Sequence, residues 1–168
     1  ALKKVAEHGK IIGVMMPQVI SVEELIETKR IIKELGFDKN VKIGIMVETP
    51  GAALTIEKFC QEGINFISFG TNDLTQYTLA IDRGEESIQH LYNETHPAVL
   101  YQLAFVIDIC KKYNVETSIC GQAGSKKEMA SFLVEKGISS ISVNADVAGE
   151  ISKFVQELES KQFHEDKH

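Results

Sequence analysis

Residues 41–50 read Val41-Lys42-Ile43-Gly44-Ile45-Met46-Val47-Glu48-Thr49-Pro50, and this stretch indicates how the chain folds. The run from Val41 to Val47 is nearly continuous in apolar character, which is typical of a parallel strand covered on both faces. Thr49-Pro50 then opens a helix, because proline suits the first helical turn. The stretch therefore predicts a strand that leads directly into a helix.

The same pattern of strand followed by helix recurs along the chain. Apolar runs predict strands at Ile11 to Met16, Val41 to Val47, Ile64 to Phe69, Val115 to Ile119 and Ile138 to Val143. Capping boxes predict helix starts at Ser21 and Ser125. Strands that alternate with helices indicate an α/β fold with a parallel sheet. A flavodoxin-like sheet and a piece of an eight-stranded barrel fit this pattern equally well.

The composition excludes several classes of protein. The chain has 168 residues, 43% of them hydrophobic, which suits one soluble core. Its net charge of −6 and pI near 5.4 argue against a nucleic-acid partner. No run approaches the roughly 18 apolar residues of a membrane helix, so no membrane partner is expected. Three cysteines without paired spacing predict reduced thiols in a cytoplasmic protein, with Cys60 and Cys110 buried on helical faces.

Carboxylates follow two consecutive predicted strands. In either architecture, functional groups gather at the carboxyl ends of the strands. Glu48 follows the second strand and Asp73 follows the third one along the chain. Adjacent parallel strands lie about 4.8 Å apart, so the two carboxylates can converge on one Mg²⁺, with substrate and water as the other ligands. The alternative is that each carboxylate caps the helix that follows it.

Three further features near these strand ends fit ligand binding. Gly70-Thr71-Asn72-Asp73 begins a helix whose backbone amides can hold a carboxylate or a phosphate. Arg83 can fork onto a phosphate, or it can form a surface ion pair with Asp82 or Glu85. Cys120 can exchange protons if it is partly exposed, or it can be a small buried hydrophobe.

The motifs at these positions resemble those of a known family. Residues 66–83 resemble the second signature of the PEP-utilising enzymes, and residues 44–50 and 119–122 resemble the flanking motifs in the same order. The resemblance implies a TIM-type (β/α)₈ barrel that binds pyruvate or PEP. Residues 1–160 would form its C-terminal part, about five βα units with parallel strands, followed by a polar tail at 161–168.

The resemblance also implies roles for individual residues. Glu48 and Asp73 are the expected ligands of Mg²⁺, with Mn²⁺ as a possible substitute. Cys120 is the expected acid/base at the methyl or methylene carbon of the substrate. The residues expected to bind substrate are Gly70, Thr71, Asn72, Asp73, Arg83 and Gln122. The metal would stabilise the enolate of pyruvate while a phosphoryl group is transferred.

Within the family, residues 120–122 and 137–144 look most like phosphoenolpyruvate synthase (pyruvate, water dikinase), which forms PEP from ATP, pyruvate and water. Residues 44–50 and His90-Leu91-Tyr92 lean toward enzyme I of the sugar phosphotransferase system, and pyruvate, phosphate dikinase is a third member. The phosphohistidine and the ATP-binding domain of such enzymes lie upstream. We therefore expect no PEP synthesis by these residues alone, and we expect self-association, as a homodimer, because an incomplete barrel exposes sheet edges.

Two readings come from other classes of protein. A non-catalytic module for PEP sensing or dimerisation would use the same barrel, since family barrels also dimerise. A receiver or nucleotide-binding domain would require a phosphate loop or an acidic cluster after the first strand. Met16-Pro17-Gln18 stands at that position and offers neither.

Overall fold

The computed structural model describes residues 2–6, 11–36 and 38–165 of the chain. Within these ranges, five strands form one sheet in the order β1-β2-β3-β4-β5, and every neighbouring pair is parallel. The strands are β1 (Ile12–Met16), β2 (Val41–Val47), β3 (Phe66–Gly70), β4 (Glu116–Cys120) and β5 (Ser140–Ile141). The predicted strand at residues 41–47 is confirmed with the same bounds.

The order of the strands decides between the two architectures that the sequence left open. A doubly wound sheet of the flavodoxin type has the order 2-1-3-4-5, with a switch point where the direction of winding reverses. Here each strand pairs with the strand that precedes it in the chain, and the direction never reverses among the described strands. This is the order of consecutive units in a (β/α)₈ barrel, so the prediction of a partial barrel is confirmed.

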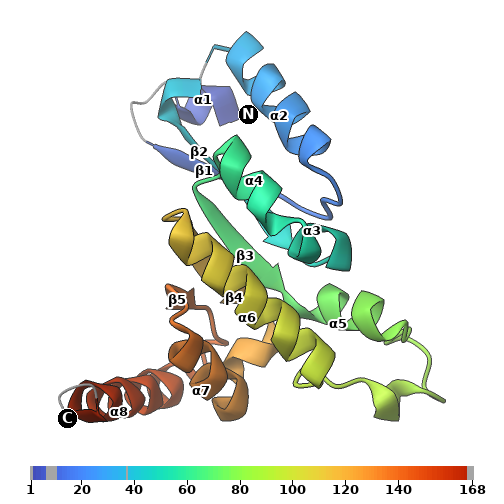
Figure 1. Cartoon of the computed structure of the whole chain (residues 1–168), viewed down its shortest axis with the longest axis vertical. Coiled ribbons are helices and arrows are strands. Elements are labelled where there is room, and N and C mark those ends of the chain that lie inside the picture. Colours follow the sequence, from blue (N-terminus) through green and yellow to red (C-terminus); the bar gives the residue numbers. More distant parts are fainter. Residues whose placement is uncertain (1, 7–10, 37, 166–168) are drawn as a thin grey trace.

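Helices connect the strands and pack against one another in chain order (Figure 1). This is the arrangement of the outer ring of helices in a barrel. The α-helices are α1 (Leu2–Ala6), α2 (Val22–Glu34), α3 (Pro50–Leu54), α4 (Ile56–Glu62), α5 (Thr71–Leu79), α6 (Pro97–Lys112), α7 (Lys127–Lys136) and α8 (Ala148–Glu165). Short 3₁₀ turns are η1 (Asp38–Asn40), η2 (Gln89–Leu91) and η3 (Gln122–Ser125).

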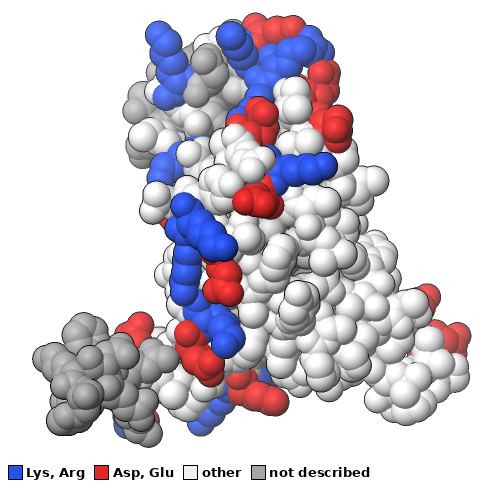
Figure 2. Space-filling view, in the orientation of Figure 1, with Lys and Arg blue, Asp and Glu red and all other residues white. Residues whose placement is uncertain are grey.

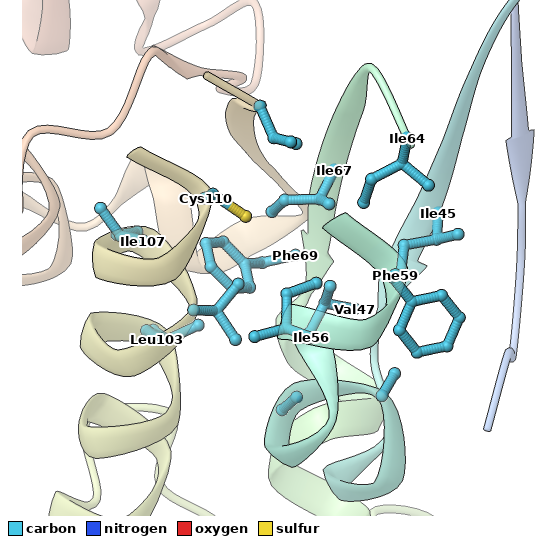
Figure 3. Packing of buried hydrophobic residues seen from close by; sticks show 14 of the residues in the cluster. Ile45, Val47, Ile56, Phe59, Ile64, Ile67, Phe69, Leu103, Ile107 and Cys110 are labelled. Carbon is cyan, nitrogen blue, oxygen red and sulfur yellow. The ribbon is translucent and has the colours of Figure 1, made fainter. Parts of the chain in front are cut away.

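The hydrophobic core lies between the sheet and these helices. Phe69 of β3 is fully buried, and Leu103 and Ile107 of α6 and Ile56 of α4 lie around it (Figure 3). Along β2, the buried residues Ile43, Ile45 and Val47 alternate with residues that point to the other face, because successive side chains of a strand point to opposite sides. The helix-facing residues of each strand therefore supply the core.

The opposite face of the sheet is more open. Met15 and Lys42 are exposed there, and Glu116 of β4 is exposed as well. Gly44 and Phe66 share a row across this face, and a Cβ added to Gly44 would lie 2.4 Å from the Phe66 ring. Glycine at this position therefore makes room for an aromatic side chain from the next strand.

Two local predictions differ from the structure. The capping box at Ser21 is confirmed, since the Ser21 N–H donates to Glu24 Oε1 at 2.9 Å. The one at Ser125 is wrong, because Ser125 ends η3 and its hydroxyl accepts the N–H of Asn144 at 3.1 Å, so α7 begins two residues later. The predicted strand at residues 138–143 is shorter than expected, although the N–H groups at 139 and 142 still donate to β4 carbonyls.

Three smaller predictions concern the cysteines, the tail and the membrane. Cys60 and Cys110 are buried as predicted, and their mutual hydrogen bond, followed by burial, raises the pKa of Cys110. Helix α8 extends into the segment predicted as a tail, as far as Glu165, and residues 166–168 lie outside the described part. No helix among the described residues is long and apolar enough to cross a membrane.

Candidate functional site

The predicted metal ligands and the predicted acid/base lie at one edge of the sheet. Val47 pairs with Phe69, and Gly70 pairs with Cys120. Glu48 follows Val47 directly, so Glu48, Gly70 and Cys120 form one row across β2, β3 and β4, on the face away from the helices. The carboxylate and the thiol therefore lie in one row at the carboxyl ends of three adjacent strands, with Gly70 between them.

Glu48 is a buried member of this row. Only 5% of its surface is exposed, and its Oε1 accepts the backbone N–H of Gln18 at 2.7 Å. Its other oxygen lies over Gly70, since a Cβ added to Gly70 would be 2.5 Å from Glu48 Oε2. None of the described Lys and Arg side chains forms an ion pair with Glu48. A buried carboxylate normally has a cationic partner or a metal ion, so this donor fits a divalent cation.

Asp73 and Arg83 lie together at the same edge. Asp73 is in the first turn of α5, directly after β3, and Arg83 Nη2 donates to Asp73 Oδ1 at 3.1 Å. The ion pairs of Arg83 with Asp82 or Glu85 that the sequence left open are not the ones formed, because those carboxylates accept hydrogen bonds from Gly84 and Ser87 instead. Arg83 is therefore held at the candidate site by one of the two predicted metal ligands.

The first two residues of α5, Thr71 and Asn72, lie against the loop after β4, and we call them the Thr71–Asn72 turn. A Cβ added to Gly121 would lie 3.8 Å from both Asn72 Nδ2 and Thr71 Oγ1. Gly121 has φ of +96°, a conformation that favours glycine, so the backbone there stays close to this turn. The N–H groups of the first turn of α5 have no partners within the helix and can donate hydrogen bonds to an anionic ligand.

Cys120 and Gln122 come from β4 and the loop that follows it. Cys120 is half-buried and its Sγ donates to Phe69 O at 3.4 Å, so the thiol is not sealed in the core. Gln122 is exposed as the first residue of η3. The alternative of a fully buried Cys120 is therefore wrong.

Two residues of this region were not singled out from the sequence. Gln18 has φ of +52° and supplies the amide that binds Glu48. Glu94 lies in the segment between α5 and α6, yet only 4% of its surface is exposed. Nothing in the spacing of residues 82–95 marks one acidic residue as buried, since loops lack the periodicity that reveals an inward face.

A magnesium site needs fewer protein ligands than a site for most other metals. Among the described residues, no group of three or more His, Cys, Asp and Glu side chains gathers in a way that could hold a metal. Mg²⁺ is commonly bound by only one or two carboxylates, because substrate oxygens and water complete its octahedron. A site built on Glu48 and Asp73 agrees with that pattern.

Tyr92 contacts the same turn from the α5–α6 loop. Its hydroxyl donates to Asn72 O at 3.2 Å. Burial, and then the neighbouring charge of Glu94, raise the pKa of Tyr92. The phenol therefore stays protonated and remains a hydrogen-bond donor.

A groove of about 480 Å³ lies elsewhere, between α7, β5 and α8. Its lining is mainly aliphatic and hydroxyl-bearing, with Glu159 as its one acidic residue. Since the groups capable of chemistry gather at the row of Glu48, Gly70 and Cys120, the groove is not the candidate site.

Comparison with known proteins identifies the family of the chain. The family model described as "PEP-utilising enzyme, PEP-binding domain" matches residues 1–160. The phosphoenolpyruvate synthase of Pyrococcus furiosus is 55% identical over 96% of this chain, and the phosphoenolpyruvate-protein phosphotransferase of Haemophilus influenzae is 40% identical over 94%. The matched parts are 20% and 29% of those proteins, so the chain spans a fifth to under a third of their length.

A solved structure supports the fold alone. An HpcH/HpaI aldolase/citrate lyase family protein from Burkholderia cenocepacia superposes with a TM-score of 0.61, over 96% of this chain and 69% of that one, at 18% identity. The predicted resemblance, including the greater similarity to phosphoenolpyruvate synthase, is confirmed by the relatives. With its matching family model, its strand order and its row of Glu48, Gly70 and Cys120, the chain belongs to the PEP-utilising enzymes and is their PEP-binding domain.

Proposed function

We propose that this chain is the substrate-binding domain of a phosphoenolpyruvate synthase and binds pyruvate or PEP at the row of Glu48, Gly70 and Cys120. The observation that carries the proposal is the buried Glu48, which has no basic partner in the described residues and lies in line with a half-buried thiol. The 55% identity to the Pyrococcus furiosus enzyme supports this member of the family over the phosphotransferase, which is 40% identical.

Glu48 and Asp73 would hold Mg²⁺, with Mn²⁺ as a substitute that prefers similar oxygen ligands. When bound, the ion supplies positive charge for the carboxylate and the neighbouring oxygen of the ligand. Glu48 is pre-positioned by the Gln18 amide, which fixes one of its oxygens. To bind the ion, Asp73 must give up at least part of its contact with Arg83. This costs little free energy, because exposed ion pairs contribute about 0–1 kcal/mol.

The residues of the chain divide the remaining tasks. Asn72, Gln122 and the backbone N–H groups near Gly70 and Thr71 bind the oxygens of the ligand. Gly70 leaves room for Glu48, whose Oε2 would lie 2.5 Å from a Cβ added to Gly70. Arg83, once released from Asp73, binds the phosphoryl group with its planar guanidinium. These roles follow from the position of each residue at the carboxyl edge.

Cys120 transfers the proton to and from the methyl carbon of pyruvate, which is the methylene carbon of PEP. In the direction of PEP synthesis, the Cys120 thiolate takes a proton from the methyl carbon of pyruvate, and the resulting enolate oxygen attacks the phosphorus of a phosphohistidine. The P–N bond breaks as the P–O bond forms, and the electron pair returns to the imidazole. In the reverse direction the Cys120 thiol returns the proton to the methylene carbon.

The phosphohistidine and the ATP that charges it are proposed for other parts of a longer protein, because the chain spans a fifth of its synthase relatives. We expect no PEP synthesis by these 168 residues alone. A reducing cytoplasm suits the three free cysteines of the described chain.

Asp73→Asn and Glu48→Gln should each weaken binding of oxalate, a mimic of the pyruvate enolate, by about a hundredfold in the presence of Mg²⁺. Both changes remove the charge of a proposed metal ligand and keep its shape. Isothermal titration calorimetry with and without Mg²⁺ measures the effect. Asp108→Asn, an exposed acidic residue on α6, is the matched control and should bind like the wild type. Equal affinity of all four proteins would remove both carboxylates from the site.

The surface supports a homodimer. Figure 2 shows a face without charged side chains over α3, α5 and the first half of α6. These helices carry the exposed side chains Leu54, Tyr77 and Tyr101, which are 61%, 47% and 67% exposed. We propose this uncharged face, rather than the sheet edges, as the contact between two copies, because exposed apolar patches mark interaction sites.

Tyr101→Glu should therefore raise the dissociation constant of the dimer by about tenfold or more, since aromatic anchors dominate interfaces. Sedimentation velocity over a concentration series measures this constant. Leu35→Glu changes an equally apolar exposed residue beside the charged helix α2 and should leave it unchanged. A wild type that is monomeric at all concentrations would contradict the dimer.

A further inference from the structure

Glu94 is a buried carboxylate whose two oxygens have different partners. Its Oε1 accepts the Thr71 hydroxyl at 3.2 Å, and its Oε2 lies 2.6 Å from Lys126 Nζ. Glu94 is 4% exposed, whereas the side chain of Lys126 is 56% exposed. The ion pair therefore spans the boundary between the interior and the solvent.

These three residues join three separate segments of the chain at the carboxyl edge. Thr71 follows β3, Glu94 lies between α5 and α6, and Lys126 lies between η3 and α7. Tyr92, two residues before Glu94, donates to the carbonyl of Asn72. The α5–α6 loop thus holds both residues of the Thr71–Asn72 turn, one by its side chain and one by its backbone.

The negative charge of Glu94 would weaken binding of an anionic ligand at the proposed site. This inference rests on the proposed function, which places the oxygens of such a ligand at the Thr71–Asn72 turn. A buried carboxylate next to the turn repels such an anion more strongly than an exposed one, because the interior screens charge poorly. Lys126 lies in direct contact with the carboxylate and offsets its charge.

We propose that Glu94 is a positioning residue that fixes the Thr71–Asn72 turn for an anionic ligand, and that Lys126 cancels its charge. The pair has two separable effects. The carboxylate orients the Thr71 hydroxyl through a hydrogen bond, which an amide oxygen can also accept. Lys126 is needed only while residue 94 carries a negative charge.

A double-mutant cycle separates this proposal from a purely structural ion pair. The probe is oxalate with Mg²⁺, titrated into the full chain and the variants E94Q, K126M and E94Q/K126M. K126M should weaken binding about tenfold, because it leaves Glu94 charged and unpaired. E94Q should bind at least as well as the wild type, and the double variant should stay within about twofold of E94Q. K127M is the control, since Lys127 is the neighbouring lysine and pairs with Glu150 on α8.

The cycle overturns the proposal if K126M weakens binding as much in the E94Q background as in the wild type. Lys126 would then contact the ligand directly and not act through Glu94. A K126M variant that binds like the wild type would equally exclude the role.

Hydrogen exchange without any ligand tests the positioning role independently. E94L removes the acceptor of the Thr71 hydroxyl, so the amides of residues 75–78 in α5 should exchange about tenfold faster, while E94Q keeps them protected. Unchanged exchange in E94L would overturn the inference. If the wild type binds no oxalate but E94L loosens α5, the proposed function fails and the positioning role stands.

Discussion

Gly70→Ala is expected to abolish Mg²⁺-dependent oxalate binding while the chain stays folded. A methyl group at this position would lie 2.5 Å from Glu48 Oε2, 2.7 Å from Glu48 Cβ and 2.9 Å from Met46 Cε. The backbone at Gly70 has φ of −94°, which alanine adopts, so the effect comes from displacing Glu48 and Met46. Changes to the residues that support a metal ligand lower metal affinity by up to about a hundredfold. Since Gly70→Ala would displace a proposed ligand itself, the affinity for oxalate should fall by at least that much.

Calorimetry with oxalate and Mg²⁺ measures the loss, and thermal unfolding of the unliganded chain shows that the variant is folded. Gly149→Ala on α8 is the matched control, because no atom lies within 4 Å of its added Cβ. It should bind like the wild type and be slightly more stable, since alanine favours a helix over glycine. A folded Gly70→Ala variant with unchanged affinity would show that Glu48 does not have to stay in its place for the ligand to bind.

Phe69→Ala should have the largest effect on stability. The ring is fully buried and lies among residues of α4 and α6 (Figure 3). Removing it loses the transfer free energy of the ring and leaves a cavity, at a cost of about 3–5 kcal/mol in the free energy of unfolding. Domains are stable by only about 5–15 kcal/mol in total, so the variant should be close to unfolding at 37 °C.

Urea unfolding followed by circular dichroism measures this change, and Leu35→Ala provides the comparison. Leu35 is 48% exposed at the end of α2, so its truncation should change the free energy of unfolding by under about 0.5 kcal/mol. If the two variants were equally stable, the core would not be organised around Phe69 as described.

The sequence predicted the elements of the fold better than their order. The apolar run at residues 41–47 and the Thr49-Pro50 junction are local signals, and the Thr49 hydroxyl does accept the Ala52 N–H at 3.1 Å. The choice between a flavodoxin-like sheet and a barrel depends on which strands are neighbours. That is a property of the packed chain, and strand patterns are the same in both architectures.

The candidate site was predictable where its residues stand at strand ends. Glu48, Asp73 and Cys120 all follow apolar runs, and parallel strands bring such positions to one edge. Glu94 escaped this reasoning because it comes from a long loop and is buried by contacts with distant residues. The capping box predicted at Ser125 was wrong for a related reason. The N–H of Asn144, far along the chain, donates to the hydroxyl that a local cap would have needed.

The alternation of side chains along β2, β3 and β4 gives each strand two independent tasks. Odd-numbered positions such as 43, 67 and 119 belong to the core, whereas even-numbered ones such as 46, 68 and 118 line the other surface, one row below Glu48, Gly70 and Cys120. Selection or design can therefore change the side chains beneath the proposed ligand site without changing the residues of the core. A protein built in this way can change what it recognises while it keeps its scaffold.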